Sequence, residues 1–181
     1  MTLRFRMTLI FIPMGLYVSH EKFPKPQLYR WLFRHITLAV ISKGELTYLK
    51  EVLGANYDLR YLPFGVDHRF WIPNNQPVEQ RSAGEAYVLS VGNDRHRDYS
   101  TLIRAWKEEY PLLKIITRLS IETPLPDNVQ ILAGDWRQQL FTDAQMRELF
   151  QNSLFVILPL RETIQPSGQS ACLQAMACAK A

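Results

Sequence analysis

Short apolar runs alternate with longer amphipathic stretches along most of the chain. The apolar runs end at Gly, Pro or polar residues, which predicts strands at 37–42, 59–63, 86–91, 112–117, 129–133 and 154–158. The longer stretches between them predict helices at 44–53, 98–110, 142–152 and 168–178. Because strands and helices alternate, the pattern predicts an α/β fold with doubly wound sheets of parallel strands.

Local signals support three of these helices. One face of helix 98–110 consists of apolar residues at positions i, i+3, i+4 and i+7, namely Tyr99, Leu102, Ile103 and Trp106. Thr142 can cap helix 142–152, because Gln145 then takes the capping-box position. Gly54 follows helix 44–53 and is expected to end it.

An apolar run near the start of the chain, residues 7–18, follows Arg4 and Arg6 and looks like a short signal-peptide core. It is too short to span a bilayer, which takes about 20 apolar residues. Pro13 and Gly15 interrupt the run, and no small-x-small cleavage site follows it. We therefore predict a buried strand followed by a turn, with a signal peptide as the alternative.

A segment rich in Pro and Asn, residues 71–84, separates two series of elements. This composition is typical of a linker. The sequence therefore predicts two parts, 1–76 and 84–181. We expect residues 61–73 to cross between two sheets and residues 71–84 to be exposed.

Composition and charge narrow the class of partner. The 181 residues are 47% hydrophobic and 21% charged, which is enough apolar material for a core. The net charge of +4 at pH 7 favours anionic ligands weakly. Because the Lys and Arg residues are scattered and form no basic stripe, we expect no nucleic-acid partner.

The two cysteines and four histidines suggest no covalent or metal chemistry. Cys172 and Cys178 lie in one predicted helix, about 240° apart around its axis, so they cannot form a disulfide with each other. We expect both to be buried thiols in a reducing compartment. The histidines lack metal-ligand spacing, and we expect no metal site.

The last predicted strand and helix offer a candidate anion site. Strand 154–158 leads through a loop to a helix that starts near Gly168. Ligands of open α/β sheets bind at the carboxyl ends of strands, and a helix N-terminus there offers free N–H groups and partial positive charge. Gly168 lets another group approach the backbone closely, and Ser167 or Ser170 can add a hydroxyl.

Gln174 is the one large polar side chain of this apolar helix, and it shares a face with Ser170 one turn earlier. A buried Gln needs hydrogen-bond partners. Two explanations are equally open: a pair of hydroxyls on a ligand, or an ordinary bond to the protein backbone.

The run VILPLRETIQPSGQSACLQAMACAKA, residues 156–181, resembles the nucleotide-sugar-binding motif of retaining glycosyltransferases with the GT-B fold, namely glycosyltransferase family four and its relatives. The start of the family's helix is matched by Ser167, Gly168, Gln169 and Ser170, and its body is matched by residues 174–177. The two glutamates that are usual in the family fall at Pro166 and Gln174, so neither is acidic here. Ala179 stands where the family usually has Gly.

Other segments are similar to the same family. Residues 61–73 look like its link between two domains, with Phe64 in place of the usual Asn. Residues 87–106 look like the first strand, loop and helix of its second domain, and residues 127–136 and 142–153 match the strand and helix that follow.

The resemblance implies roles for residues beside the donor. Arg97 lies where the family has a Lys near the diphosphate, with Arg95 as the near alternative, and a guanidinium can pair two phosphate oxygens. The other interpretation of both is that of solvated loop arginines. Arg161 could reach a phosphate, and Glu162 could bond a sugar hydroxyl in place of the missing first glutamate. His20 follows the first apolar run, where the family often has a polar loop facing its cleft, or it is simply an exposed loop histidine.

The activity implied by the resemblance is transfer of a sugar from a nucleotide-sugar donor to an acceptor hydroxyl, with retention and with neither a metal nor a further cofactor. The acceptor would be a saccharide, a lipid-linked compound or another hydroxyl compound. The location would be cytoplasmic, with peripheral membrane contact as an option. Residues 1–76 would be the end of the acceptor domain and its link, and residues 84–181 the first half of the nucleotide-sugar-binding domain.

We therefore expect the chain to be a fragment truncated at both ends and inactive alone. The alternatives are a GT-B nucleotide-sugar epimerase and a non-catalytic nucleotide-binding or assembly module.

Overall fold

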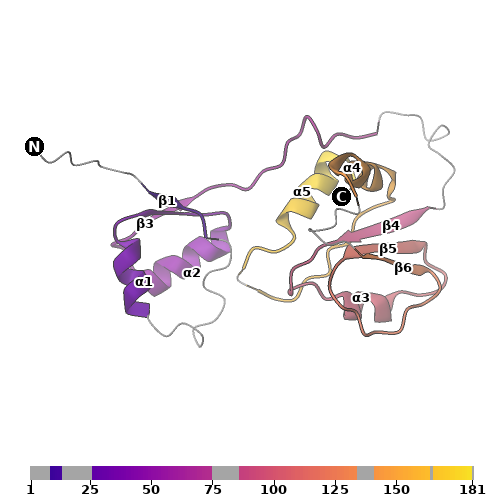
Figure 1. Ribbon diagram of the computed structural model, residues 1–181, viewed down its shortest axis with the longest axis horizontal. Helices are drawn as coiled ribbons and strands as arrows, with labels where there is room; N and C mark the ends of the chain where they lie inside the picture. Colours follow the sequence, from indigo (N-terminus) through magenta and orange to yellow (C-terminus); the bar gives the residue numbers. More distant parts are fainter. Residues whose placement is uncertain (1–8, 14–25, 75–85, 134–140, 164, 181) are drawn as a thin grey trace, which may run out of the picture. The chain divides into compact units, whose positions relative to one another are not determined.

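The computed structural model describes residues 9–13, 26–74, 86–133, 141–163 and 165–180 (Figure 1). Within them lie two separate three-stranded sheets, and all strand pairs in both sheets are parallel. The chain divides into two compact units. The first unit is Met1–Phe64 with Thr163–Pro166, and the second is Gly65–Glu162 with Ser167–Ala181.

The first unit is a parallel sheet with two helices. Its elements are β1 (Ile10–Phe11), α1 (Pro26–Phe33), β2 (Thr37–Val40), α2 (Lys43–Leu53) and β3 (Asp58–Tyr61), in the strand order β1-β2-β3. The central strand β2 contributes Leu38 and Val40 to the core, together with Leu49 of α2. The strands predicted at 37–42 and 59–63 are confirmed as β2 and β3, and the helix predicted at 44–53 is confirmed as α2. Gly54 ends α2 with a positive φ of 91°.

The start of the first unit differs from the prediction. Only β1 is a strand within the apolar run at 7–18, and Ile10 is 61% exposed, so the expectation of a buried strand is wrong at this position. The physical reason is that side chains alternate between the two faces of a strand: Phe11 packs against Phe33 of α1, whereas Ile10 points to the opposite face. Residues 7, 8 and 14–18 lie outside the described part. The sequence pattern predicts no element at 26–33, where the structure has α1.

The second unit carries the longer sheet and three helices. Its elements are β4 (Tyr87–Val91), α3 (Tyr99–Ala105), β5 (Leu112–Thr117), β6 (Val129–Ala133), α4 (Asp143–Asn152) and α5 (Gln169–Ala177), in the strand order β4-β5-β6. Strands β5 and β6 coincide with the predicted ranges. The capping box predicted for Thr142 and Gln145 is also confirmed at the start of α4.

The predicted strand at 154–158 is an extended segment that follows the free edge of β4. Its backbone bonds to β4 through Leu154 N to Tyr87 O (2.8 Å) and Ile157 N to Leu89 O (2.9 Å). The side chain of Ser90 adds a bond from its Oγ to Ile157 O at 2.8 Å. Within residues 154–158, only Val156 forms a parallel bridge, with Leu89 of β4. The segment is therefore extended without being a full strand.

Helices cover both faces of the second sheet. Alternate residues of β4 point to opposite faces, so Leu89 packs in one apolar cluster and Val88 in the other. The first cluster includes residues of α4 and α5, and the second includes residues of α3 (Figure 1). This is the doubly wound α/β arrangement that the sequence predicts.

Helix α3 ends at Ala105, five residues before the predicted end. Trp106 is already extended, and its Nε1 donates a hydrogen bond to Pro111 O at 3.0 Å. The side chain therefore stabilises a turn where its apolar spacing alone predicts a further turn of helix.

The segment after the first unit is partly packed against α4. Trp71 is half-buried, and its ring lies 5.5 Å from that of Phe150 in an edge-to-face arrangement. Gln151 Nε2 donates to Ile72 O at 2.7 Å. The expectation that residues 71–84 are exposed is therefore wrong for Trp71, because its aromatic ring reaches the core of the second unit. Residues 75–84 lie outside the described part, and the predicted boundaries at 76 and 84 stay predictions.

The two cysteines are both free, but they differ in exposure. Cys178 is buried in the cluster between the sheet and α4, whereas Cys172 is exposed on α5, so the expectation of two buried thiols is wrong for Cys172. Among the described helices, none has the length and apolar character that crossing a bilayer requires.

Candidate functional site

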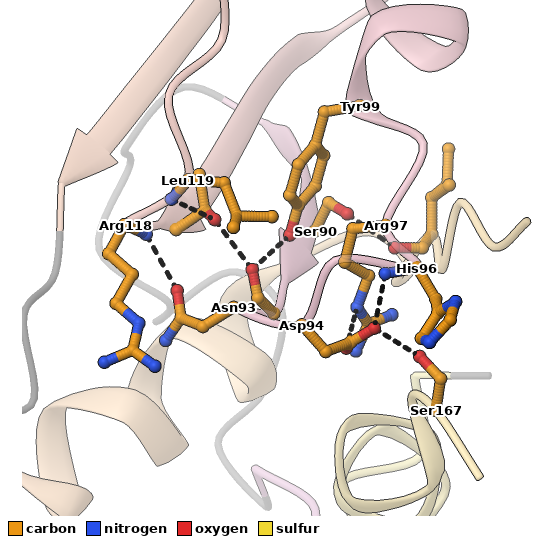
Figure 2. Close-up of polar contacts among 12 residues, drawn as sticks. Ser90, Asn93, Asp94, His96, Arg97, Tyr99, Arg118, Leu119 and Ser167 are labelled. Atoms are coloured by element: carbon orange, nitrogen blue, oxygen red, sulfur yellow. Dashed lines mark hydrogen bonds and ion pairs between the residues drawn. The ribbon is translucent and has the colours of Figure 1, made fainter. Parts of the chain in front are cut away.

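The loop between β4 and α3 leaves the sheet at Gly92 and is held in one conformation by hydrogen bonds. The carbonyl oxygen of Gly92 accepts from the Tyr99 hydroxyl at 2.8 Å and from Thr117 Oγ1 at 2.7 Å (Figure 2). Asn93 Oδ1 accepts from the backbone N–H of Arg118 at 2.7 Å. Helix α3 and the end of β5 therefore fix this loop at the carboxyl end of the sheet.

Arg97 is the last residue of the loop, and its side chain folds back beneath it. Only 3% of the side chain is exposed, and Nε donates to Asp94 Oδ2 at 3.0 Å (Figure 2). The backbone of Arg97 bridges to Leu160 in antiparallel fashion. A Cβ atom on Gly92 would overlap Arg97 Nε and lie 2.6 Å from Cζ, so the guanidinium occupies space that only glycine leaves open.

The guanidinium also borders the start of α5. Gly168 is the N-cap of this helix, with a φ of +76°, and no side chain caps the helix. A Cβ atom on Gly168 would lie 3.1 Å from Arg97 Nη1. Arg97 therefore lies beside Gly168, and a binding role for the two residues stays a proposal.

Arg97 Nη1 is buried and has no hydrogen-bond partner among the residues that the structure describes. An unpaired buried donor is costly, by about 1–3 kcal/mol and more for a charged group, and such cases in native proteins call for an explanation. The first N–H groups of a helix also lack intrahelical partners, and they carry partial positive charge. Arg97 and the start of α5 together therefore form a site whose electrostatics favour an anion.

Asp94 connects the two segments of this site. Its Oδ1 accepts from Ser167 Oγ at 2.7 Å and from the backbone N–H of His96 at 3.1 Å (Figure 2). Burial alone would raise the pKa of Asp94, but the hydrogen bond from Ser167, the charge of Arg97 and the remaining hydrogen bonds together lower it. Asp94 is therefore ionised at neutral pH.

Sequence reasoning missed Asp94, although a signal was present. An acidic residue three positions before an arginine is a spacing at which the two side chains can pair, and the structure pairs them. The hydroxyl of Ser167 donates to Asp94 Oδ1, and a contact between Ser167 and a ligand stays a prediction.

The remaining charged candidates lie on the surface. Arg95 and Glu162 are exposed. The side chain of Arg161 is 59% exposed, and its Nη2 lies 3.7 Å from Asp98 Oδ1, while its backbone N–H donates to His96 O at 2.8 Å. Arg161 therefore borders the loop without facing the buried guanidinium.

The candidates on α5 follow the helix away from Gly168. Ser170 is exposed in the first turn, Gln169 is half-buried, and Gln174 is half-buried one turn later. His20 lies outside the described residues. In the described part of the chain, no group of three or more His, Cys, Asp or Glu side chains is placed to hold a metal ion.

Three solved structures match nearly the whole chain. Sucrose-phosphate synthase from Thermosynechococcus elongatus matches with a TM-score of 0.69 and 18% identity over 97% of this chain and 49% of its own. A glycosyltransferase from Rickettsia africae matches with a TM-score of 0.62 and 14% identity over 94% and 49% of the two chains. HepE from Anabaena, solved with UDP and glucose, matches with a TM-score of 0.59 and 14% identity over 96% and 51%.

The fold is that of part of a GT-B glycosyltransferase. The chain, with its two parallel sheets, spans about half the length of the solved structures that it matches. No protein-family model matches the sequence, and no curated protein matches it. The likeness at these identities establishes the fold, and the activity is a matter for proposal.

Proposed function

We propose that the chain binds the diphosphate of a nucleotide-sugar donor, as part of a glycosyltransferase that moves the sugar to an acceptor hydroxyl. The observation that carries this proposal is the buried guanidinium of Arg97, whose Nη1 borders the uncapped start of α5 and has no partner in the described part of the chain. The solved neighbours support sugar transfer as the chemistry, and one of them was solved with UDP and glucose.

The chemistry of the leaving group explains why such a site is useful. When the bond between the sugar and the diphosphate breaks, negative charge grows on the diphosphate. A planar guanidinium can donate to two phosphate oxygens, and the helix N-terminus adds N–H donors and partial positive charge. In this proposal these groups supply the neutralisation, and transfer proceeds with retention and without a divalent cation or a further cofactor.

Other residues of the site take supporting roles in the proposal. Gln174 holds the two ribose hydroxyls by accepting from one and donating to the other, since its amide has both functions. Gln169 and Ser170 contribute the first N–H groups of α5. Arg161 and Glu162 reach the phosphate and a sugar hydroxyl from the surface, and the acceptor is a saccharide, a lipid-linked or another hydroxyl compound.

The epimerase and assembly-module alternatives are not favoured. The matched structures named above include a glycosyltransferase and a sucrose-phosphate synthase, and none of the three is described as an epimerase. We therefore keep sugar transfer in the cytoplasm as the single candidate function.

Calorimetric titration of the chain with UDP, ADP, GDP and UDP-glucose tests the proposal. We expect binding of at least one nucleoside diphosphate, and Arg97→Met should weaken it about 10- to 100-fold, since hydrogen bonds to charged groups contribute about 1.5–3 kcal/mol. Arg104→Met is the matched control, because Arg104 is an exposed arginine of α3 whose side chain bonds to Thr101.

Arg95→Met decides between the two loop arginines that the sequence leaves open. If Arg97 binds the diphosphate, Arg95→Met should change the affinity less than twofold. Unchanged affinity in Arg97→Met, or no binding of any nucleoside diphosphate by the wild-type chain, would overturn the proposed function. A transfer assay with labelled UDP-glucose and hydroxyl acceptors then tests the reaction in the protein that contains this chain.

A further inference from the structure

We infer that Asp94 is a positioning residue, which holds Arg97 and the Ser167–Gly168 turn at the spacing that a bound diphosphate requires. This inference rests on the proposed function. It concerns a residue that does not touch the ligand in the proposal and to which the resemblance to glycosyltransferases assigns no role.

The two oxygens of Asp94 serve two different segments. Oδ2 accepts from Arg97 Nε at 3.0 Å, within the loop that follows β4. Oδ1 accepts from Ser167 Oγ at 2.7 Å, 73 positions away in the sequence and next to the N-cap of α5. One carboxylate therefore joins the arginine to the helix start, and the Ser167–Gly168 turn cannot move away from Arg97 without breaking this bond.

The nitrogen of Arg97 that bonds to Asp94 determines which nitrogens of the guanidinium remain for a ligand. Asp94 bonds to Nε of Arg97, and Nη1 is left without a partner on the side of Gly168. A guanidinium presents its donors in a rigid plane, so fixing Nε also fixes the direction of both Nη groups. Asp94 therefore orients the guanidinium and leaves the buried Nη1 for a phosphate oxygen in the proposed function.

A positioning role and a purely electrostatic role of Asp94 predict opposite changes in diphosphate affinity when the charge of Asp94 is removed. Asp94 is ionised, and a negative charge beside an anion site weakens anion binding by Coulomb repulsion. If that repulsion were its whole effect, neutralising Asp94 would tighten the binding of a diphosphate. If Asp94 positions Arg97, neutralising it lets the guanidinium leave its place, and binding weakens.

Asp94→Asn is the deciding variant, because the amide keeps the shape, loses the charge and replaces one accepting oxygen by a donor. We expect UDP affinity, measured by calorimetry on the full chain, to fall about tenfold. In an Arg97→Met background there is no arginine to position, so the same change should tighten the residual UDP binding or leave it unchanged. Asp127→Asn is the control, because Asp127 is an exposed acid in the turn that precedes the amino end of β6.

A second readout needs no ligand. The proton on Arg97 Nε is bonded to Asp94 and buried, so its NMR signal should exchange slowly with water in the wild type and at least tenfold faster in Asp94→Asn. Ser167→Ala, which removes one of the two donors to Oδ1, should leave this signal slow and weaken UDP binding a few-fold. Both variants should keep the circular dichroism spectrum of the folded chain.

The outcomes separate this inference from the proposed function. Two results would overturn the inference: tighter UDP binding in Asp94→Asn, or an Arg97 Nε proton that exchanges equally slowly in the wild type and in Asp94→Asn. In either case, UDP binding by the wild type would still uphold the proposed function. If the wild type binds no nucleoside diphosphate, the proposed function fails, and the diphosphate spacing assigned to Asp94 fails with it.

Discussion

Helices α4 and α5 pack against the same face of the second sheet, but they begin in opposite ways. The start of α4 is closed by its own side chains: Thr142 Oγ1 accepts from the Gln145 N–H, and Gln145 Oε1 accepts from the Thr142 N–H at 2.8 Å. The first turn also carries Asp143. The start of α5 has Gly168 as its N-cap, no capping side chain and no acidic residue in its first turn.

This difference indicates that the chain uses the start of α4 for stability and leaves the start of α5 for a ligand. A cap contributes about 1 kcal/mol, and α2 and α3 are also capped, by Ser42 and Asp98. At α5 that contribution is absent, and the cation of Arg97 lies beside the positive end of the helix dipole with the Asp94 carboxylate as its ion-pair partner. The start of α5 therefore keeps its first N–H groups for the anion of the proposed function.

The largest effect is expected from giving α5 the acidic start that α4 has. In Gly168→Asp, a carboxylate occupies the place of the ligand's phosphate and pairs with Arg97. Repulsion between it and the diphosphate should lower UDP affinity about 100-fold or more, as measured by calorimetry.

Gly168→Asn is the control for this change, because Asn tolerates the positive φ of this position as Asp does and carries no charge. Its affinity loss should be about ten times smaller than that of Gly168→Asp. Equal losses in the two variants would mean that the shape of the turn, and not its charge, governs binding.

The next largest effect is expected at Gly92, beside the space that the Arg97 guanidinium fills. In Gly92→Ala, the added methyl group would overlap the Arg97 guanidinium, so the arginine must leave its slot. We expect UDP affinity to fall about tenfold and the free energy of unfolding to fall by about 1–3 kcal/mol, the usual cost of overpacking a filled site. Urea denaturation and calorimetry measure the two quantities.

Gly44→Ala makes the matched comparison, because the Cβ atom at this position of α2 would meet only Ser42 Oγ at 3.7 Å. It should leave UDP affinity unchanged and raise the stability by about 0.4–1 kcal/mol. If Gly92→Ala behaves in the same way, Arg97 does not depend on the glycine beneath it.

A smaller effect is expected at the closed helix start. Thr142→Ala removes the cap of α4 and should lower the free energy of unfolding by about 1 kcal/mol, measured by urea denaturation. UDP affinity should not change, and Thr142→Ser, which keeps the hydroxyl, should restore most of the stability. A loss of UDP affinity in Thr142→Ala would show that the two helix starts are coupled.

The sequence predicts the second sheet well because its signals are local. The apolar runs of β5 and β6 end at polar residues, and the capping box of α4 uses two residues three positions apart. The errors arise where a partner distant in sequence decides the structure. Trp71 is half-buried because Phe150 lies beside it, and Ile10 of β1 is exposed because it points to the face opposite the contact between Phe11 and Phe33.

The candidate site divides in the same way. A helix start at Gly168 is visible in the sequence, because a glycine precedes an apolar helical run. Composition and spacing cannot tell that Arg97 is buried while Arg95, two positions earlier, is exposed. Asp94 was missed because an acidic residue is not expected beside an anion site until the contact with Arg97 Nε is seen.

The smallest effect is expected from Gln174→Glu, one turn along α5. If its amide holds the two ribose hydroxyls, Gln174→Glu replaces a neutral acceptor by a charged one, and such charge-assisted bonds are about twice as strong. UDP affinity should rise about threefold, while Gln174→Ala should lower it about tenfold or more by leaving hydroxyl groups unpaired. Gln130→Glu, the same change at an exposed position of β6, should have no effect on affinity. Calorimetry with UDP and with 2′,3′-dideoxy-UDP separates the ribose contact from the rest of the site, because only the ligand that has the hydroxyls should distinguish the three residues at position 174. Equal UDP affinities for Gln, Glu and Ala would assign Gln174 to the protein interior and limit the ligand-binding part of α5 to its uncapped first turn.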